Sequence, residues 1–292
     1  MVLHSYAKLN LYLEVLNKRA DGYHNIKTLF ERIDLADKIT LNPTAGGKTT
    51  IISNSRLIPK DKKNFAYQAA ELLRKEYRIS EGLRIHIEKN IPVGAGLAGG
   101  SSNAASVLMG LNKLWNLRLS RSKLAGFAAR IGSDVPFFVH DAPFAYGHGR
   151  GEKISIVNSL KSRRLWHILV VPNLAVSTPS IYRHWDLLKD NKKARLTRPK
   201  LGVKILTSSI RKRLVLSSNS GFYNGLEIVT IKKYPELNSI KNQLRNLGLK
   251  AILMSGSGPA FFSIIASRKE AVRRFKQLKG FRSWRVFLTK TR

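Results

Sequence analysis

Residues 92–105 read Pro-Val-Gly-Ala-Gly-Leu-Ala-Gly-Gly-Ser-Ser-Asn-Ala-Ala, and this stretch decides the fold of the chain. It follows an alternating run at 83–87, typical of a strand, and leads into an apolar pattern over 102–115 that predicts a helix. Glycines let a backbone approach a ligand closely, and the free N–H groups at a helix start bind anions. The stretch therefore predicts an anion-binding loop, with Ser101 and Ser102 as helix caps or as hydroxyl donors to phosphate.

Three better-known phosphate loops do not fit this stretch. Its glycines match the GxGxxG spacing of dinucleotide sites, but no Asp or Glu between 88 and 134 could hold a ribose. No Lys stands beside Ser101 as a P-loop requires, and the HRD and DFG companions of protein kinases are absent. A plain turn that only caps a helix is the bland alternative. Four glycines and two serines at one strand–helix junction favour a different phosphate-binding loop.

The composition narrows the class of protein. The chain has 292 residues and no cysteine, which excludes disulfides, thiolate zinc sites and cysteine nucleophiles and favours a reducing cytoplasm. The first residues lack the pattern of a signal peptide. The longest uncharged stretch, 251–267, is too short for a membrane span and is interrupted by Ser-Gly-Ser-Gly-Pro. We therefore expect a cytoplasmic protein without a membrane segment.

The charge is strongly basic, with 52 Lys and Arg against 18 Asp and Glu and a net charge of +34. Such a balance suits nucleic acids, and it equally suits anionic small molecules. A nucleic-acid binder would gather basic residues and aromatics on one face, whereas here they are scattered through every expected element. We expect no specific nucleic-acid partner, and a monomer or weak homodimer.

The chain divides into two parts with different patterns. In the first part, apolar alternation predicts strands at 2–16, 37–42, 48–53 and 83–87, and helical spacing predicts helices at 65–78, 102–115 and 122–130. In the second part we expect strands at 166–171, 249–254, 260–266 and 282–288, and helices at 179–188, 225–232, 235–247 and 268–279, with an exposed basic excursion at 189–200. That order is a split βαβ sandwich. It predicts an α+β fold with a boundary near 155–165.

Three motifs together resemble the GHMP kinases, a family of small-molecule kinases. The glycine stretch is similar to the family's central ATP motif, Ala-Lys-Leu-Asn-Leu at 7–11 to its N-terminal motif, and Leu-Met-Ser-Gly-Ser-Gly-Pro at 253–259 to its C-terminal motif. Their order and spacing also agree, over some 250 residues. The resemblance implies a two-domain GHMP kinase fold, with an N-terminal ATP-binding and catalytic domain at 1–158 and a C-terminal ferredoxin-like domain at 159–292.

Further motifs point to one branch of the family. These are Arg-Ala-Asp-Gly-Tyr-His at 19–24, Gly-Ser-Asp-Val-Pro-Phe-Phe at 132–138 and Gly-Arg-Gly-Glu at 149–152. They resemble the branch whose acceptor is 4-diphosphocytidyl-2-C-methylerythritol, in the non-mevalonate isoprenoid pathway. This implies transfer of the ATP γ-phosphoryl group to the 2-hydroxyl of the methylerythritol part. The alternatives are a relative acting on mevalonate, homoserine or a sugar and, from another class, a basic nucleic-acid-binding protein.

Lys8 and Asp134 form the expected catalytic pair. Phosphoryl transfer needs an oriented hydroxyl, a group that takes its proton, and positive charge near the moving phosphoryl group. Asp134 is the first acid after the acid-free stretch and lies between apolar runs, so we expect burial to hold it and a cation to keep it ionised. By resemblance Asp134 is the base and Lys8 orients the hydroxyl. A surface lysine and a capping aspartate are the bland alternatives.

The resemblance also assigns the nucleotide site. ATP is the co-substrate and brings Mg²⁺, and because the histidines show no HxxxH or HExxH spacing we expect no dedicated metal site. Asn64, before the helix at 65, corresponds to a residue near adenine. The implied ATP-binding residues are Pro92, Val93, Gly94, Ala95, Gly96, Leu97, Ala98, Gly99, Gly100, Ser101, Ser102, Asn64, Gly256, Ser257 and Gly258.

The acceptor site is implied by the turn at 21–24. A tyrosine ring can stack on cytosine, and an imidazole can form a hydrogen bond with its edge. The family uses the pair Tyr23 and His24 for the base and Asn10 near the erythritol. Thr178 and Tyr182 lie in a segment that resembles a second aromatic contact. Core packing is the alternative for the tyrosines, and an ordinary loop histidine for His24.

The sequence departs from the family pattern at four positions, the first of which is Lys63 in place of the usual aspartate before Asn64. Ala98 stands where a glycine is usual and suits only negative φ. Gly225 replaces an aspartate in an Asn-Asp-hydrophobe-Glu run, and Ala260 replaces a frequent threonine. We expect these changes to bear on turnover and affinity rather than on the class of reaction.

Overall fold

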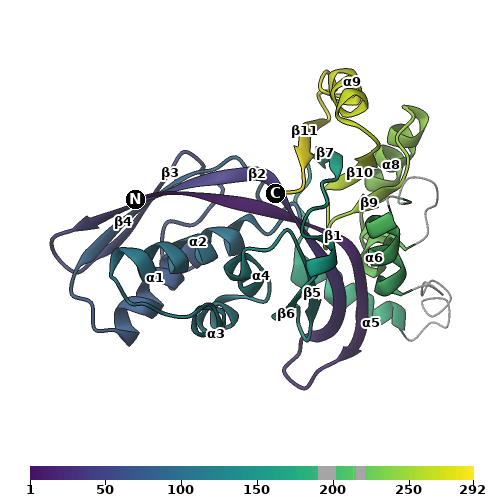
Figure 1. Ribbon diagram of the computed structural model, residues 1–292. Helices are drawn as coiled ribbons and strands as arrows, with labels where there is room; N and C mark the ends of the chain where they lie inside the picture. The colour runs from purple at the N-terminus through teal and green to yellow at the C-terminus, as the bar shows by residue number, and fades with distance from the viewer. Residues whose placement is uncertain (190–201, 213, 215–220) are drawn as a thin grey trace.

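The computed structural model describes residues 1–189, 202–212, 214 and 221–292 (Figure 1). The first part of the chain contains β1 (Val2–Lys18), β2 (His24–Thr44), β3 (Thr49–Ser53), α1 (Phe65–Glu76), β4 (Gly82–Glu88), α2 (Gly99–Leu114), α3 (Arg121–Ile131), α4 (Val135–His140), β5 (Phe144–His148) and β6 (Lys153–Ile156). The second part contains η1 (Asn158–Leu160), β7 (Trp166–Pro172), α5 (Thr178–Lys189), α6 (Val203–Lys212), β8 (Tyr223–Asn224), α7 (Gly225–Lys233), α8 (Glu236–Asn246), β9 (Ile252–Met254), β10 (Phe261–Ile265), α9 (Arg268–Leu278) and β11 (Trp284–Lys290).

The large sheet is organised around the two longest strands, β1 and β2, which sweep across the molecule in Figure 1. Its order is β3-β4-β2-β1-β8, and β5 pairs with both β2 and β6. The antiparallel register of β1 and β2 slips between Tyr6 and Lys8 and again between Asn10 and Tyr12. Such irregularities re-aim side chains and are frequent beside active sites. Between the two slips, Lys8 and Asn10 point to the same face because they are two residues apart.

Four helices, α1 to α4, cover one face of this sheet (Figure 1). Asn64 caps α1, because its side chain accepts the N–H of Ala66 at 2.9 Å. The central helix α2 carries the small residues Ala104 and Ala105, both fully buried, so that neighbouring backbones pack closely around it. The glycine loop therefore leads into the most enclosed helix of the first part, which fixes the position of the loop.

The smaller sheet has the antiparallel order β11-β7-β10-β9. Numbered by their order in the chain, these strands lie in the sheet as fourth, first, third and second, which is a split βαβ arrangement, and α9 crosses between β10 and β11. This is the ferredoxin-like order that was predicted for the second part of the chain.

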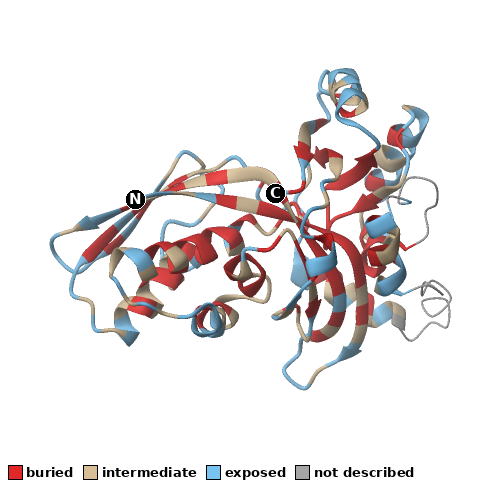
Figure 2. Cartoon of the chain, viewed as in Figure 1, coloured by how far each residue is buried: buried red, intermediate tan, exposed pale blue. Residues whose placement is uncertain are grey.

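The two sheets share a hydrophobic core. Leu9 and Leu11 of β1 pack in one cluster with Leu169 of β7 and Phe262 of β10, and the buried residues run without a break between the two parts in Figure 2. A parallel pairing of Tyr12 with Tyr223 adds β8 to the edge of the large sheet. The division at 158/159 stays a prediction, because the packing crosses it.

A polar cluster lies at the joint of the two sheets. Glu31 of β2 and His167 of β7 are both fully buried, and His167 Nε2 lies 2.9 Å from Glu31 Oε1. The hydroxyl of Thr291 donates to the same oxygen at 2.5 Å. The C-terminal residues are thereby tied to a strand of the first part.

The expected elements recur with shifted ends, but several short ones were not predicted. Missing were the first half of β2, and α4, β5, β6, α6 and β8. β5 and β6 are only five and four residues long, and β8 only two, which leaves too little periodicity to detect. The basic excursion predicted at 189–200 lies almost wholly outside the described residues.

Candidate active site

A cleft of about 940 Å³ brings the three motifs together. It lies between the glycine loop, the middle of β1, the turn before β2 and the start of α5. Of the residues assigned from the sequence, Ser102 and Gly258 do not line it. The others do: Lys8, Asn10, Tyr23, His24, Asn64, every residue from 92 to 101, Asp134, Thr178, Tyr182, Gly256 and Ser257.

The glycine loop has a backbone that mostly glycine can adopt. Gly94 and Gly96 have φ of +68° and +74°. A Cβ on Gly96 would lie 2.1 Å from the carbonyl oxygen of Ser255, so this position excludes any side chain. The contact also seats the central motif directly on the C-terminal one. Ser255 reinforces it, because its hydroxyl donates to the Gly96 carbonyl at 3.1 Å.

The start of α2 is open to the cleft. Its N-cap residue is Ala98, and no side chain caps the helix, so the predicted caps Ser101 and Ser102 are wrong. Ser102 is buried and instead forms a hydrogen bond of 2.8 Å with Ser5 on β1. The first N–H groups of a helix have no partner within it, so they are available to an anion in the cleft.

Ala98 also differs from the expectation for its backbone. An alanine suggested negative φ, but Ala98 has φ +54° and ψ +32°, in the left-handed region. The loop therefore keeps the conformation that glycine favours. This costs roughly 1–2 kcal/mol for a residue with a Cβ.

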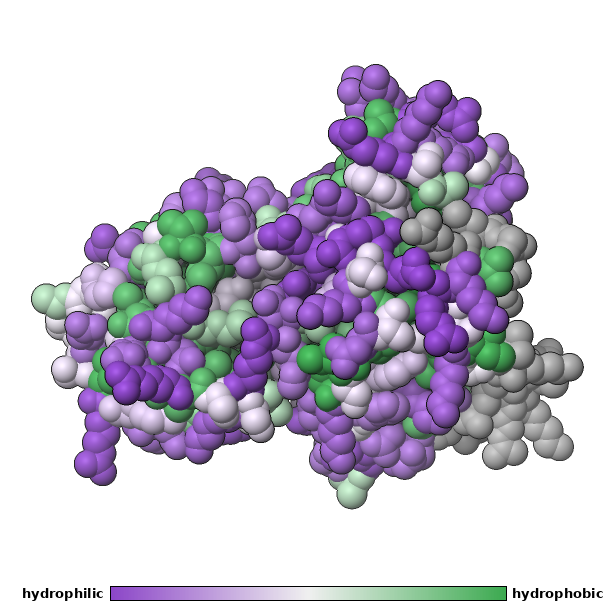
Figure 3. All heavy atoms as spheres, in the orientation of Figure 1, coloured by the Kyte–Doolittle hydropathy of each residue, from purple (hydrophilic) through white to green (hydrophobic). Residues whose placement is uncertain are grey.

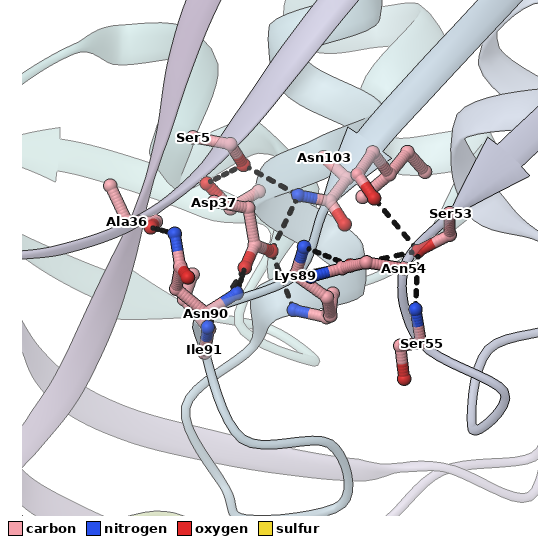
Figure 4. Close-up of polar contacts among 12 residues, drawn as sticks. Ser5, Ala36, Asp37, Ser53, Asn54, Ser55, Lys89, Asn90, Ile91 and Asn103 are labelled. Atoms are coloured by element: carbon pink, nitrogen blue, oxygen red, sulfur yellow. Dashed lines mark hydrogen bonds and ion pairs between the residues drawn. The ribbon is translucent and has the colours of Figure 1, made fainter.

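A buried carboxylate fixes both ends of the loop, as Figure 4 shows. Asp37 on β2 is fully buried and accepts the backbone N–H groups of Asn90 and Ile91, each at 2.8 Å. It also accepts the Asn103 amide at 2.9 Å and the Lys89 ammonium at 2.5 Å. Burial lowers the pKa of Lys89, and Asp37 opposes the shift. Sequence reasoning missed Asp37, because a single acid in a strand carries no local signal.

Lys8 and Asp134 meet at the centre of the cleft. Lys8 Nζ lies 3.5 Å from Asp134 Oδ2, donates a hydrogen bond to Asn10 Oδ1 and lies 5.4 Å from the centre of the Phe30 ring. Burial lowers the pKa of Lys8, and the Asp134 charge partly opposes this. The amide of Asn10 in turn donates to Thr28 at 2.8 Å, so both β1 side chains are held in place.

Asp134 was expected to be buried, but in the structure Lys8 is the buried member of the pair. The Lys8 side chain is 5% exposed, whereas that of Asp134 is 32% exposed, because Asp134 lies at the rim where α4 begins. Its side chain makes no capping bond to α4. A purely structural role as a helix cap therefore does not explain why a carboxylate stands at this position.

Aromatic rings form the opposite wall of the cleft. Tyr23 is 53% exposed and Arg150 covers its ring at 4.9 Å. His24 is buried and stacks on Tyr182, with ring centroids 5.1 Å apart and planes at 25°. Burial, and secondarily the Asp134 charge, raises the pKa of the Tyr182 phenol. The wall therefore combines the turn of the first part with α5 of the second.

The remaining predicted residues hold segments in place. The hydroxyls of Thr178 and Ser257 form a hydrogen bond of 2.7 Å that joins α5 to the C-terminal motif. Asn64 is largely engaged within the protein, since its amide also donates to the Pro59 carbonyl at 2.7 Å. It shapes the nearby cleft wall. Gly258 keeps φ +81° against Met254, behind the cleft surface.

The departure at Gly225 is explained by packing. Asn224 and Glu227 of that run bind the C-terminal motif, through the Met254 and Gly256 carbonyls and the Met254 N–H. A Cβ on Gly225 would lie 3.3 Å from the ring of Trp185, so this glycine makes room for a large side chain. Ala260 is fully buried, and nothing in the structure explains its difference from threonine.

The described part of the chain lacks two features, a cluster of metal ligands and a membrane-spanning helix. This part contains no group of three or more His, Cys, Asp or Glu that could hold a metal ion. In the same residues, no helix has the length and apolar character that crossing a bilayer requires.

The chain is similar to kinases of one family, both in family models and in individual relatives. The family model for the GHMP kinases N terminal domain matches residues 64–142, and that for the GHMP kinases C terminal region matches 206–281. A 4-diphosphocytidyl-2-C-methyl-D-erythritol kinase of Geobacillus sp. (strain WCH70) is 44% identical over 275 residues, covering 94% of this chain and 91% of the relative.

Solved structures give the same result. A 4-(cytidine 5'-diphospho)-2C-methyl-D-erythritol kinase aligns with a TM-score of 0.81 and 32% identity, over 99% of this chain and 98% of that one. The mevalonate kinase of Methanococcus jannaschii aligns with a TM-score of 0.66 at 13% identity, over 100% of this chain and 98% of that one. The latter likeness concerns the fold alone.

Proposed function

The chain belongs to the GHMP kinase family and, within it, to the 4-diphosphocytidyl-2-C-methyl-D-erythritol kinases, and we propose that Lys8 and Asp134 are its catalytic pair. The reaction is the ATP-dependent phosphorylation of the cytidyl-linked methylerythritol on its 2-hydroxyl. One observation carries the proposal: the pair, 3.5 Å apart, lies in one cleft between a phosphate-binding loop and an aromatic wall.

Each member of the pair has a task suited to its surroundings. The carboxylate of Asp134 reaches the cleft and takes the proton of the attacking hydroxyl. The ammonium of Lys8, buried and held by Asn10, keeps a positive charge beside the oxygen atoms on which charge accumulates during transfer. Because Asn10 and Phe30 hold Lys8 rigidly, little reorganisation is needed in the transition state.

ATP would lie along the glycine loop. The open N–H groups at the start of α2 favour phosphate oxygens, and the wall near Asn64 would receive the adenine. Mg²⁺ keeps several waters and binds through phosphates and one or two carboxylates. The cleft supplies such a carboxylate in Asp134, so the residues fit a metal that arrives with the nucleotide.

The acceptor would occupy the aromatic wall. Tyr23 offers an exposed ring for stacking on cytosine, and His24 and Tyr182 lie beside it as a stacked pair. Asn10 is near Lys8 and suits the erythritol end, while Thr178 stands where α5 borders the cleft. The reaction centre would thus lie between the two walls.

A coupled assay tests the function directly. We expect turnover with ATP and the cytidyl-linked acceptor, and turnover lower by several orders of magnitude with mevalonate, homoserine or sugars. Equal activity on any of these would favour the alternative within the family.

The nucleic-acid alternative has a separate test. In the view of Figure 3, hydrophilic residues cover most of the coloured face, and apolar residues appear among them in small patches. Binding to DNA that is driven by the +34 charge should weaken steeply with salt. Tight DNA binding that persists at physiological salt, together with no kinase activity, would contradict the proposed function.

A further inference from the structure

Asp186 on α5 lies at the edge of the cleft and binds two cationic or polar groups of the other part of the chain. Its Oδ1 lies 2.6 Å from His24 Nε2, and its Oδ2 lies 2.7 Å from Lys18 Nζ. The side chain is 25% exposed. Partial burial works to raise the pKa of Asp186, but the hydrogen bonds from Lys18 and His24 outweigh it and lower the pKa. Asp186 is therefore a carboxylate at neutral pH.

This contact fixes which nitrogen of His24 carries a proton. An ionised carboxylate can only accept hydrogen bonds, so Nε2 must donate. In a neutral imidazole the other nitrogen then has no proton and is an acceptor. His24 is 5% exposed and its ring is held against Tyr182, so the ring cannot turn over freely. In its neutral form, the side chain of His24 thus offers the cleft only Nδ1, as an acceptor.

We propose that Asp186 is a positioning residue that makes the cleft select cytosine over uracil, by fixing His24 as an acceptor at Nδ1. Cytosine carries an exocyclic amine, which can donate to such an acceptor. Uracil carries a carbonyl oxygen at the same place, which leaves two acceptors facing each other. This inference rests on the proposed function, because it assumes that the acceptor base binds beside His24.

The substitution Asp186→Asn separates this role from simple loss of contact. Lys18 can only donate, so it takes the carbonyl oxygen of the asparagine. The NH₂ group is then left facing His24 Nε2, which must become the acceptor, and the proton moves to Nδ1. The variant therefore inverts the hydrogen-bonding character of Nδ1 and leaves the size of the side chain unchanged.

The experiment compares cytidine 5′-diphosphate and uridine 5′-diphosphate as competitive inhibitors against the cytidyl-linked acceptor. For the wild type we expect tighter inhibition by the cytidine compound. In Asp186→Asn we expect the ratio of the two inhibition constants to fall by about tenfold or more. The KM for ATP should stay within about twofold, which also reports a folded protein. The matched control is Asp141→Asn, an exposed aspartate that pairs with Arg32 away from the cleft.

A spectroscopic measurement keeps the test independent of the variant's stability. Long-range ¹H–¹⁵N NMR correlations of His24 in the wild type should show the proton on Nε2 at neutral pH. A proton on Nδ1, or an unchanged inhibition ratio in Asp186→Asn, would overturn the role of Asp186. Neither result would affect the proposed function, which fails only if the wild type does not phosphorylate the cytidyl-linked acceptor.

Discussion

The two walls of the cleft are built in different ways. The glycine loop is made of backbone: its shape follows from φ values of +68°, +74° and +54° at positions 94, 96 and 98, and the groups proposed to bind phosphate are backbone N–H groups. The aromatic wall is made of side chains, held by contacts between Tyr23 and Arg150 and between His24 and Asp186. The backbone wall leaves no room for an added atom at Gly96, where it touches the C-terminal motif, whereas a wall of side chains can be changed one contact at a time.

The proposed catalytic pair lies where the two walls meet, and its removal should have the largest effect. Lys8→Ala or Asp134→Ala should lower kcat by on the order of 10²- to 10⁴-fold, because a positioned base and a charged donor are lost. ATP should still bind measurably, since the loop is untouched. Steady-state kinetics with calorimetry checks this, and wild-type turnover in Asp134→Ala would remove that residue from the mechanism.

Gly96→Ala tests the backbone wall. A Cβ placed 2.1 Å from the Ser255 carbonyl forces the two motifs apart, and φ of +74° adds strain. We expect ATP affinity to fall by ~10²-fold or more, because the loop can no longer present its N–H groups together. In the control Gly126→Ala, the new Cβ on α3 has no atom within 4 Å and should be neutral or stabilising. Unchanged ATP affinity in Gly96→Ala would mean that the loop is only a turn.

Tyr23→Ala tests the side-chain wall. Loss of a stacked base costs ~1–3 kcal/mol, which is roughly 5- to 150-fold in affinity. The KM for the cytidyl-linked acceptor should rise by this amount, while the KM for ATP changes little, because Tyr23 lies on the opposite wall from the loop. The kinetics should be measured near physiological ionic strength, where nonspecific attraction to the basic surface is screened. A rise in both KM values would contradict the separation of the walls.

The pH profile should report the burial of Lys8. Because burial lowers its pKa below the ordinary 10.5, the ammonium is present below that pKa and is lost as the pH rises through it. The value of kcat/KM, which reports the ionisation of the free enzyme, should therefore fall on the alkaline side before pH 10.5, by about tenfold for each further pH unit. Since the Asp134 charge raises the pKa of Lys8, the residual activity of Asp134→Asn should fall at a still lower pH. An alkaline limb at or above 10.5 would contradict this assignment.

The smallest expected effect concerns Ala98. Ala98→Gly relieves a left-handed conformation that an alanine adopts at a cost, so the free energy of unfolding should rise by about 1 kcal/mol. Equilibrium denaturation in urea measures the change. A loss of stability would show that the Ala98 methyl group contributes more by packing than it costs in strain.

The loop wall is contiguous in the sequence and the aromatic wall is not, and this difference explains which parts of the fold and the site could be predicted from the sequence. The loop at 92–105 is contiguous, so its glycines could be interpreted together, and α2 after it has a clear period. The fold class and the site around Lys8 followed from three such contiguous motifs. What the sequence could not show are contacts between distant residues. Asp37 binds Asn103, and Asp186 binds His24, and neither acid belongs to a local pattern.

Two other expectations failed for physical reasons. Burial of Asp134 was expected from its apolar neighbours, but Val135 and Pro136 are buried while Asp134 itself ends at the rim. Negative φ at Ala98 was expected from residue preference, and tertiary packing overrides that preference by holding the loop on the C-terminal motif. In both cases the position of the segment in the fold, rather than the preference of the residue or its neighbours, determined the exposure of Asp134 and the backbone conformation of Ala98.

The core shared by the two sheets has a consequence for synthesis of the protein. During synthesis, β1 acquires its β8 neighbour only when residues 223–224 have been made, and its packing partner Phe262 later still. Native contacts so far apart in the chain slow folding and leave apolar strands uncovered meanwhile. We therefore expect the nascent first half to depend on chaperones until its C-terminal residues emerge. Thr291, which donates a hydrogen bond to Glu31, can join the fold only after both of these strands.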